Sequence, residues 1–185
     1  ATLYGATVGN GVFYDCNALQ TVVIDGGVNS IGDNAFYNCG KLSSVTFNES
    51  PNKLTIGYQP STTDDVGPFY QSRLATIRLY RELEPSAMYK EQLKDWDMGI
   101  FTNSHYEDSE LTTSVTLGSN VKTIWPYMFS HVRIQQLTIP ASVTTIGNNA
   151  FDECRNLSSV TFESGSQDLH IGFQDHSSDK GTFFD

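Results

Sequence analysis

The sequence has little of several features that common functional classes require. Its 11 Lys and Arg residues stand against 21 Asp and Glu residues, which gives a formal charge of −10. Nucleic acids and anionic membrane surfaces bind clustered cations, so the sequence predicts neither kind of partner. No apolar run approaches the roughly 18 to 20 residues of a membrane-spanning helix. No membrane insertion of this chain is therefore expected.

Catalytic signatures are also lacking. The four histidines share no motif, and the chain has no G-x-S-x-G elbow, no HExxH helix and no P-loop. Asp64 and Asp65 could contribute oxygen ligands to calcium, but their loop lacks the glycine and the distal glutamate of an EF-hand. The sequence therefore predicts a protein that is not an enzyme and that uses no cofactor and no metal.

Cysteine is scarce, with three residues in 185. Cys16, Cys39 and Cys154 each lie three residues after a phenylalanine, and none belongs to a CxxC pair. This common phase predicts small, buried apolar side chains. A disulfide between Cys16 and Cys39 stays open as an alternative, because the two could be neighbours in successive repeats.

An internal repeat dominates what is present. IGDNAFYNCGKLSSVTF at 31–47 returns as IGNNAFDECRNLSSVTF at 146–162, and an earlier copy from Val8 gives a period of 23 residues to Ile31. That period lies within the range of leucine-rich repeats. The Gly and Asn residues of the first half suit tight or left-handed backbone.

The second half of each copy predicts a short strand. Leu42, Val45 and Phe47 are apolar, and small polar residues separate them. Such a strand cannot bury its apolar side alone, so neighbouring copies are expected to stack as parallel coils with a shared core. Leu42 and Leu157 should be buried at the same position of their layers.

A longer period overlies the short one. Ile31 and Ile146, like Cys39 and Cys154, are 115 residues apart. This predicts a single solenoid over 1–185, built as a supermodule at 1–115 and a partial second one at 116–185, with an irregular insertion at 80–114. Residues 86–96 could form a short amphipathic helix. The absence of an initial Met and the end within a repeat favour a processed piece of a longer parent.

The pattern IGxxAFxxCxxLxxVTF, together with IPASVTTIG at 139–147, resembles the BspA-like, or Treponema pallidum type, leucine-rich repeat family. The resemblance implies a β-rich solenoid of right-handed parallel coils, with a parallel sheet on one face and short turns, strands or helices on the other. It also implies an extracellular or cell-surface location, because members are typically exported proteins of oral or gut anaerobes associated with adhesion.

Two sets of residues are candidates for binding. The first is the outward face of the predicted sheet, although these residues could simply be solvated strand positions. Its members are short and mostly neutral: Thr21, Ser44, Thr46, Thr76, Arg78, Gln136, Thr138, Ser159 and Thr161. The second is the aromatic set of the insertion, which could instead form a small satellite core. Its members are Tyr80, Tyr89, Trp96, Phe101 and Tyr106.

These observations predict a non-catalytic, adhesin-like interaction module that binds a host or bacterial surface protein or a glycan through an extended solenoid face. The alternative is a rigid spacer that presents another domain of a longer surface protein. The two hypotheses differ in whether this chain alone binds a ligand.

Overall fold

The computed structural model describes residues 1–57, 68–87, 99–101, 111–165 and 167–172. Within these ranges the regular structure consists of short β-strands. They are β1 Thr2–Leu3, β2 Thr7–Val8, β3 Thr21–Ile24, β4 Ser30–Ile31, β5 Ser44–Phe47, β6 Leu54–Ile56, β7 Thr76–Leu79, β8 Leu83–Pro85, β9 Ser114–Leu117, β10 Thr123–Ile124, β11 Gln136–Ile139, β12 Thr145–Ile146, β13 Ser159–Phe162 and β14 His170–Ile171.

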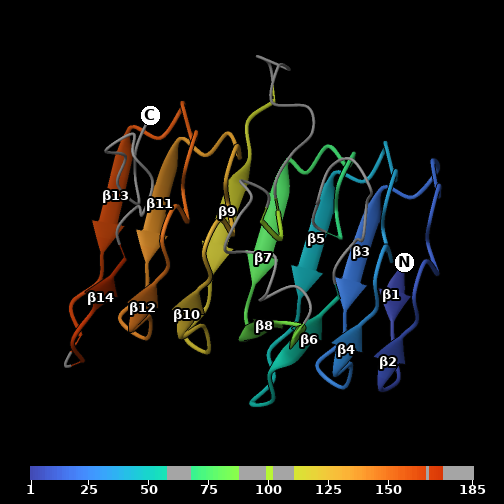
Figure 1. Ribbon diagram of the computed structural model, residues 1–185, viewed down its shortest axis with the longest axis horizontal. Helices are drawn as coiled ribbons and strands as arrows, with labels where there is room; N and C mark the ends of the chain where they lie inside the picture. Colours follow the sequence, from blue (N-terminus) through green and yellow to red (C-terminus); the bar gives the residue numbers. More distant parts are fainter. Residues whose placement is uncertain (58–67, 88–98, 102–110, 166, 173–185) are drawn as a thin grey trace.

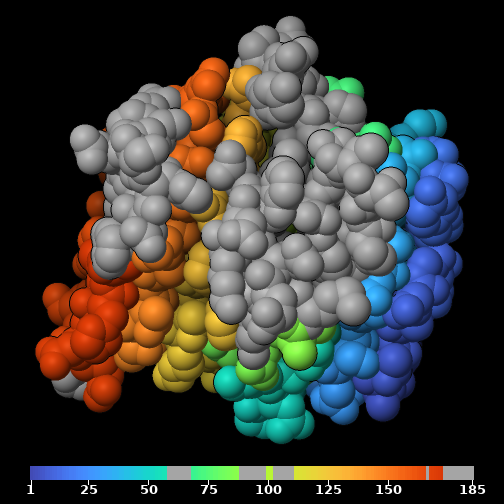
Figure 2. All heavy atoms as spheres, viewed as in Figure 1, coloured from blue at the N-terminus to red at the C-terminus, as the bar shows by residue number. Residues whose placement is uncertain are grey.

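The strands form two parallel arrays along a solenoid of about six turns (Figure 1). The first array, here the long-strand face, contains the sheet β1-β3-β5-β7-β9 and the pair β11-β13. The second, the short-strand face, contains the sheets β2-β4-β6-β8 and β10-β12-β14. The coils follow one another along the long axis, from the N-terminal coil in blue to the C-terminal coil in red (Figure 2).

The strand register confirms the repeat that was read from the sequence. Thr21 pairs with Ser44 and Val8 pairs with Ile31, in each case 23 residues apart. The pairing is parallel throughout, so equivalent residues of successive coils lie side by side. Thus the predicted β-rich solenoid of parallel coils is the fold observed.

The core is built from the predicted inward positions. Leu42, Val45 and Phe47 are fully buried. One phenylalanine of each coil stacks on the next, with ring centroids 5.2 to 5.6 Å apart. The six rings of this stack are Phe13, Phe36, Phe69, Phe101, Phe129 and Phe151. Stacked rings of this kind add to the free energy of burial.

The turn around each stacked phenylalanine has a repeated backbone. The residues two before and two after Phe36, Asn34 and Asn38, have φ values of 54° and 53°. This matches the prediction of left-handed backbone at Asn positions. Gly32 is required for a different reason: a Cβ there would lie 2.2 Å from Asn10 Oδ1 in the preceding coil. The coils therefore approach closely at the Ile-Gly step.

The short-strand face carries turns and two- or three-residue strands, rather than helices, in the described ranges. Ala87 is the only described residue in a helix; Ser86 is not helical, and residues 88–96 of the helix predicted at 86–96 lie outside these ranges. No described helix has the length and apolar character needed to cross a membrane. The segment 80–114, predicted to be irregular, begins with β8, which pairs with β6 in the regular ladder.

Leu157 is less buried than the sequence predicted. Leu42 is fully buried, whereas Leu157, at the same position of its own coil, is only partly buried against the core. Leu42 lies between coils that cover it on both sides, whereas β13 pairs only with β11 among the described strands. Burial thus follows from the neighbouring layers as well as from the repeat.

We expect Leu42→Ala to lower the free energy of unfolding by about 2 to 5 kcal/mol, because it leaves a cavity between covered layers. Leu157→Ala is the matched control at the half-covered position and should cost less than about 2 kcal/mol. Urea denaturation followed by circular dichroism measures both. A loss under about 0.5 kcal/mol for Leu42→Ala would contradict the stacking of coils.

Candidate functional site on the long-strand face

The outward residues of the long-strand face form straight rows across the coils. One row contains Thr21, Ser44, Thr76 and Ser114, which pair in register. The next row contains Val23, Thr46, Arg78 and Thr116. The side chains are exposed or half-buried. The structure therefore brings together the first candidate set that the sequence predicted.

The two rows continue on β11 and β13. Gln136 pairs with Ser159, and Thr138 pairs with Thr161. All four side chains are exposed. Whether any residue of this face binds a ligand stays a prediction, but the face itself exists and is mostly neutral.

The ladder is interrupted once on each face, at the same point along the solenoid. β9 and β11 belong to different sheets, and so do β8 and β10. Among the described residues, one isolated bridge between Thr113 and Ile134 and a backbone bond from Thr113 N–H to the Arg133 carbonyl, 2.9 Å long, link the start of β11 to the preceding strand. Beyond that point β9 and β11 are not paired.

Pro140 gives a physical reason for the loss of one ladder bond, at the end of β11. In other coils, the residue after the strand donates its N–H to the last strand residue of the preceding coil, as Tyr80 does to Phe47 at 3.0 Å and Glu163 does to Ile139 at 2.9 Å. Pro140 occupies this position after β11 and has no N–H. The bond that would close the ladder onto Leu117 therefore cannot form.

Side chains connect the coils on the two sides of this interruption, here called the junction. The Glu82 carboxylate, which is buried, accepts bonds from the N–H groups of Lys122 at 2.6 Å and Thr123 at 3.2 Å. The Trp125 Nε1–H donates to the Leu83 carbonyl at 2.8 Å. The phenylalanine stack also continues across, from Phe101 on to the next coil. The junction is thus packed on the core side and unpaired on the long-strand face.

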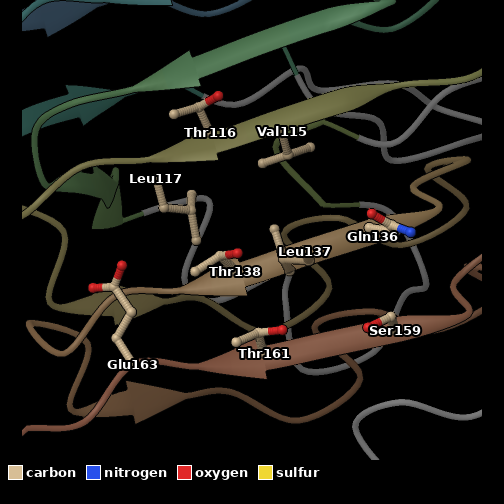
Figure 3. Close-up of a pocket in the computed structure, with 9 residues that line it drawn as sticks. All are labelled: Val115, Thr116, Leu117, Gln136, Leu137, Thr138, Ser159, Thr161 and Glu163. Atoms are coloured by element: carbon tan, nitrogen blue, oxygen red, sulfur yellow. The ribbon is translucent and has the colours of Figure 1, made fainter.

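A hollow of about 450 Å³ opens where β9 and β11 separate (Figure 3). This volume lies in the usual range of ligand sites. The hollow is lined by Val115, Thr116, Leu117, Gln136, Leu137, Thr138, Ser159, Thr161 and Glu163. It therefore includes the candidate residues Gln136, Thr138, Ser159 and Thr161, together with residues that the sequence did not point to.

The interruption exposes apolar side chains that are covered elsewhere. Ile77 and Leu79 on β7 are fully buried, whereas Val115 and Leu117, their partners on β9, are half-buried. Both side chains lie on the β11 side of β9 in Figure 3. The hollow consequently has an apolar part between the strands and a polar margin of hydroxyl and amide groups. Of the lining residues that the structure describes, Glu163 alone is charged.

The second candidate set is only partly described. Tyr80 is half-buried next to β7, and Phe101 lies in the phenylalanine stack with 2% of its surface exposed. Phe101 therefore occupies the core, as the alternative interpretation held, and does not present a ring to a partner. Tyr89, Trp96 and Tyr106 lie outside the described residues.

Arg81 was not recognised from the sequence as a structural residue. Its side chain is fully buried, and its Nη1 and Nη2 groups donate to the carbonyls of Val28 and Asn52, both at 2.8 Å. Nη1 also lies 3.3 Å from the Gly26 carbonyl. Burial lowers the pKa of the guanidinium, and the Asp25 carboxylate opposes this shift. Arg81 thus joins three coils on the side opposite to Glu82.

Cys39 and Cys154 are buried as the sequence predicted, whereas Cys16 is only half-buried. All three are free thiols, so the disulfide alternative is not observed. The Cys39 thiol donates to the Phe13 carbonyl at 3.0 Å, and the Cys154 thiol makes the equivalent bond to Phe129 at 3.1 Å. Ser72 is buried at the position where the repeat would place another cysteine.

The hollow could not be predicted from the sequence, because the repeat pattern is intact on both sides of it. Val115, Leu117 and Glu163 occupy ordinary repeat positions, and their separation depends on how two coils meet. Pro140 was the one available signal, because a proline directly after a strand removes a backbone donor. In the described part of the chain, no group of three or more His, Cys, Asp or Glu residues could hold a metal ion.

The comparison with protein families decides which family this fold and its repeats represent. The description "BspA type Leucine rich repeat region" matches six repeat copies, over residues 6–59 and 97–174. The chain belongs to the BspA type leucine-rich repeat family. The resemblance read from the Ala-Phe turn and the L-x-x-V-x-F strand is therefore confirmed.

Two solved structures are similar to this BspA type chain. A leucine rich cell surface protein from Faecalibacterium prausnitzii A2-165 is 26% identical, with 88% of this chain and 47% of that chain covered and a TM-score of 0.46. A leucine-rich repeat protein from Bacteroides ovatus ATCC 8483 is 17% identical, with 95% and 51% covered and a TM-score of 0.37. The chain thus spans about half the length of each. No curated protein matches it.

We expect Arg81→Met to lower the free energy of unfolding by about 2 to 5 kcal/mol, because the carbonyls of Val28 and Asn52 would stay buried without donors. Arg78→Met is the matched control, since Arg78 is exposed three residues away. It should change stability by less than about 0.5 kcal/mol. Equal effects in thermal and urea denaturation would refute the assigned role of Arg81.

Cys39 should make stability fall at alkaline pH. Burial raises the pKa of its thiol from 9.0 to about 11, with smaller contributions from nearby groups. Between these two pH values the thiol of the unfolded chain loses its proton, whereas the folded one keeps it. Ionisation therefore stabilises the unfolded state relative to the folded state. The unfolding free energy should therefore decrease less between pH 9 and 11 in Cys39→Val than in the unmodified protein. If urea denaturation gave the same decrease of the unfolding free energy with pH for Cys39→Val and for the unmodified protein, this prediction would be wrong.

Proposed function

We propose that the chain is a non-catalytic interaction module of an exported bacterial surface protein, and that it binds a protein or glycan through the long-strand face. The observation that carries the proposal is the in-register, exposed face of short neutral side chains, which ends at the hollow between β9 and β11. Repeat proteins commonly bind through extended surfaces of this kind.

Three further features support the proposal. Membership of the BspA type family suggests a protein-interaction or structural module. The absence of catalytic motifs in the sequence favours binding over turnover. The short Ser and Thr side chains lose little conformational entropy when a partner covers them, which favours contact with an extended surface.

Arrays of purified glycans and extracellular matrix proteins, probed with the labelled chain, test this proposal. A ligand that lies along the face should bind at least about tenfold more weakly to both Thr46→Trp and Thr138→Trp, which occupy the same row on β5 and β11. Thr55→Trp is the matched control, because Thr55 is exposed on β6 of the short-strand face. Binding that only Thr55→Trp reduces would place the site on the other face.

The alternative is a rigid spacer that presents another domain of a longer protein. The observation that favours it is the phenylalanine stack, which is continuous through the interruption of the sheets. A spacer should show no ligand in the arrays, and none of the three tryptophan variants should change that result. Specific binding by this chain alone would exclude a purely structural role.

A further inference from the structure

The strand edges that face each other across the hollow have backbone groups without a ladder partner. Ser114 and Gly118 donate to β7, to the Ala75 and Leu79 carbonyls, at 2.9 and 2.8 Å. Because backbone groups alternate along a parallel strand, Val115 and Leu117 direct their N–H and C=O groups toward β11. Among the described residues, no strand pairing or other backbone bond beyond the Thr113 bridge satisfies them.

The same alternation applies to β11. The carbonyls of Gln135 and Ile139 accept from β13, at 2.9 Å in both cases. Gln136 and Thr138 consequently direct their N–H and C=O groups toward β9. The hollow therefore presents amide donors and acceptors on both sides, next to the half-buried side chains of Val115 and Leu117. A ligand that supplies an amide can satisfy these groups, which have no backbone partner among the described residues.

The size of the free edge restricts the form of that ligand. Each strand offers only two residues with inward-directed backbone groups, because Pro140 ends β11 and the Thr113 bridge closes the other end. A peptide added as a β-strand needs an edge of about five residues. A compact group with a single amide fits this edge better than an extended peptide does.

The polar margin of the hollow indicates which other functional groups the ligand carries. It consists of the hydroxyls of Thr116, Thr138, Ser159 and Thr161 and the amide of Gln136, which can exchange hydrogen bonds with several neutral hydroxyl groups. Among the described lining residues the only charge is the Glu163 carboxylate, which also accepts from the Ala141 N–H at 3.4 Å. A carboxylate with no cation beside it in this described lining disfavours phosphate, sulfate and acidic sugars.

We propose that this hollow, here the junction site, binds an N-acetylated amino sugar that is a terminal or internal residue of a neutral glycan. The acetamido methyl packs against Val115 and Leu117, and the acetamido N–H and C=O pair with the free strand edges. The ring hydroxyls bond to Thr138, Thr161 and Glu163. This inference rests on the proposed function, because it names the ligand class for one part of the same face.

Isotope-edited NMR with N,N′-diacetylchitobiose as the probe tests the junction site directly. We expect the backbone amide signals of Val115, Leu117, Gln136 and Thr138 to shift on titration. Cellobiose, which has hydroxyls where the probe has acetamido groups, is the matched ligand and should bind about tenfold more weakly or worse. Equal binding of the two sugars, or shifts confined to other residues, would overturn the assignment.

Variants that fill the hollow provide the second arm. Thr138→Trp and Thr161→Trp both place a ring over the junction site from exposed positions, so loss of folding is not expected, and thermal unfolding checks this. Each should weaken binding of diacetylchitobiose at least about tenfold. Thr46→Trp, in the same row but on the continuous part of the sheet, should leave it unchanged.

The two proposals fail in different ways. If the arrays show a partner whose binding requires Thr46 and Thr138 while diacetylchitobiose does not bind, the interaction module stands and the junction site is refuted. If neither the arrays nor the titration shows binding, both proposals are refuted. Binding of the sugar that is lost in Thr138→Trp and kept in Thr46→Trp supports both.

Discussion

The contact between equivalent residues of successive coils is the interaction on which the whole structure depends. A single coil has too few residues to enclose its own apolar side chains, so Leu42 and Phe47 become buried only when the neighbouring coils are in place. The phenylalanine stack shows the same dependence, since each ring packs on the rings before and after it. Stability is consequently shared between layers, and Leu157, on a coil whose strand β13 has one described partner strand, is less buried than Leu42.

This dependence explains which parts of the fold the sequence could predict. The phase of the repeat determines whether a side chain points inward or outward, so the burial of Val45 and the row position of Thr46 followed from the pattern. The left-handed turns followed from Asn34 and Asn38, whose side chains tolerate that backbone. Burial at the last described coil and the strand β8 inside 80–114 did not follow, because both are decided by contacts between distant residues.

The candidate site was predictable to a similar extent. The outward rows could be named in advance, because strand residues alternate between two faces. The hollow could not, because it arises where two regular blocks fail to pair, and the missing amide of Pro140 matters only in that three-dimensional context. Phe101 shows the opposite error: an aromatic residue in an apparently irregular segment turned out to continue the core stack. Arg81 likewise became a structural residue through carbonyls that lie 29 to 55 positions earlier in the sequence.

The register of the long-strand face is independent of how much chain separates its strands. Thr21 and Ser44 are directly paired, and so are Ser44 and Thr76, and Thr76 and Ser114, although each step spans a longer stretch of sequence than the one before. The longer connections therefore do not alter the register of the rows. A coil of this solenoid can consequently gain residues between its strands while the long-strand face keeps its geometry.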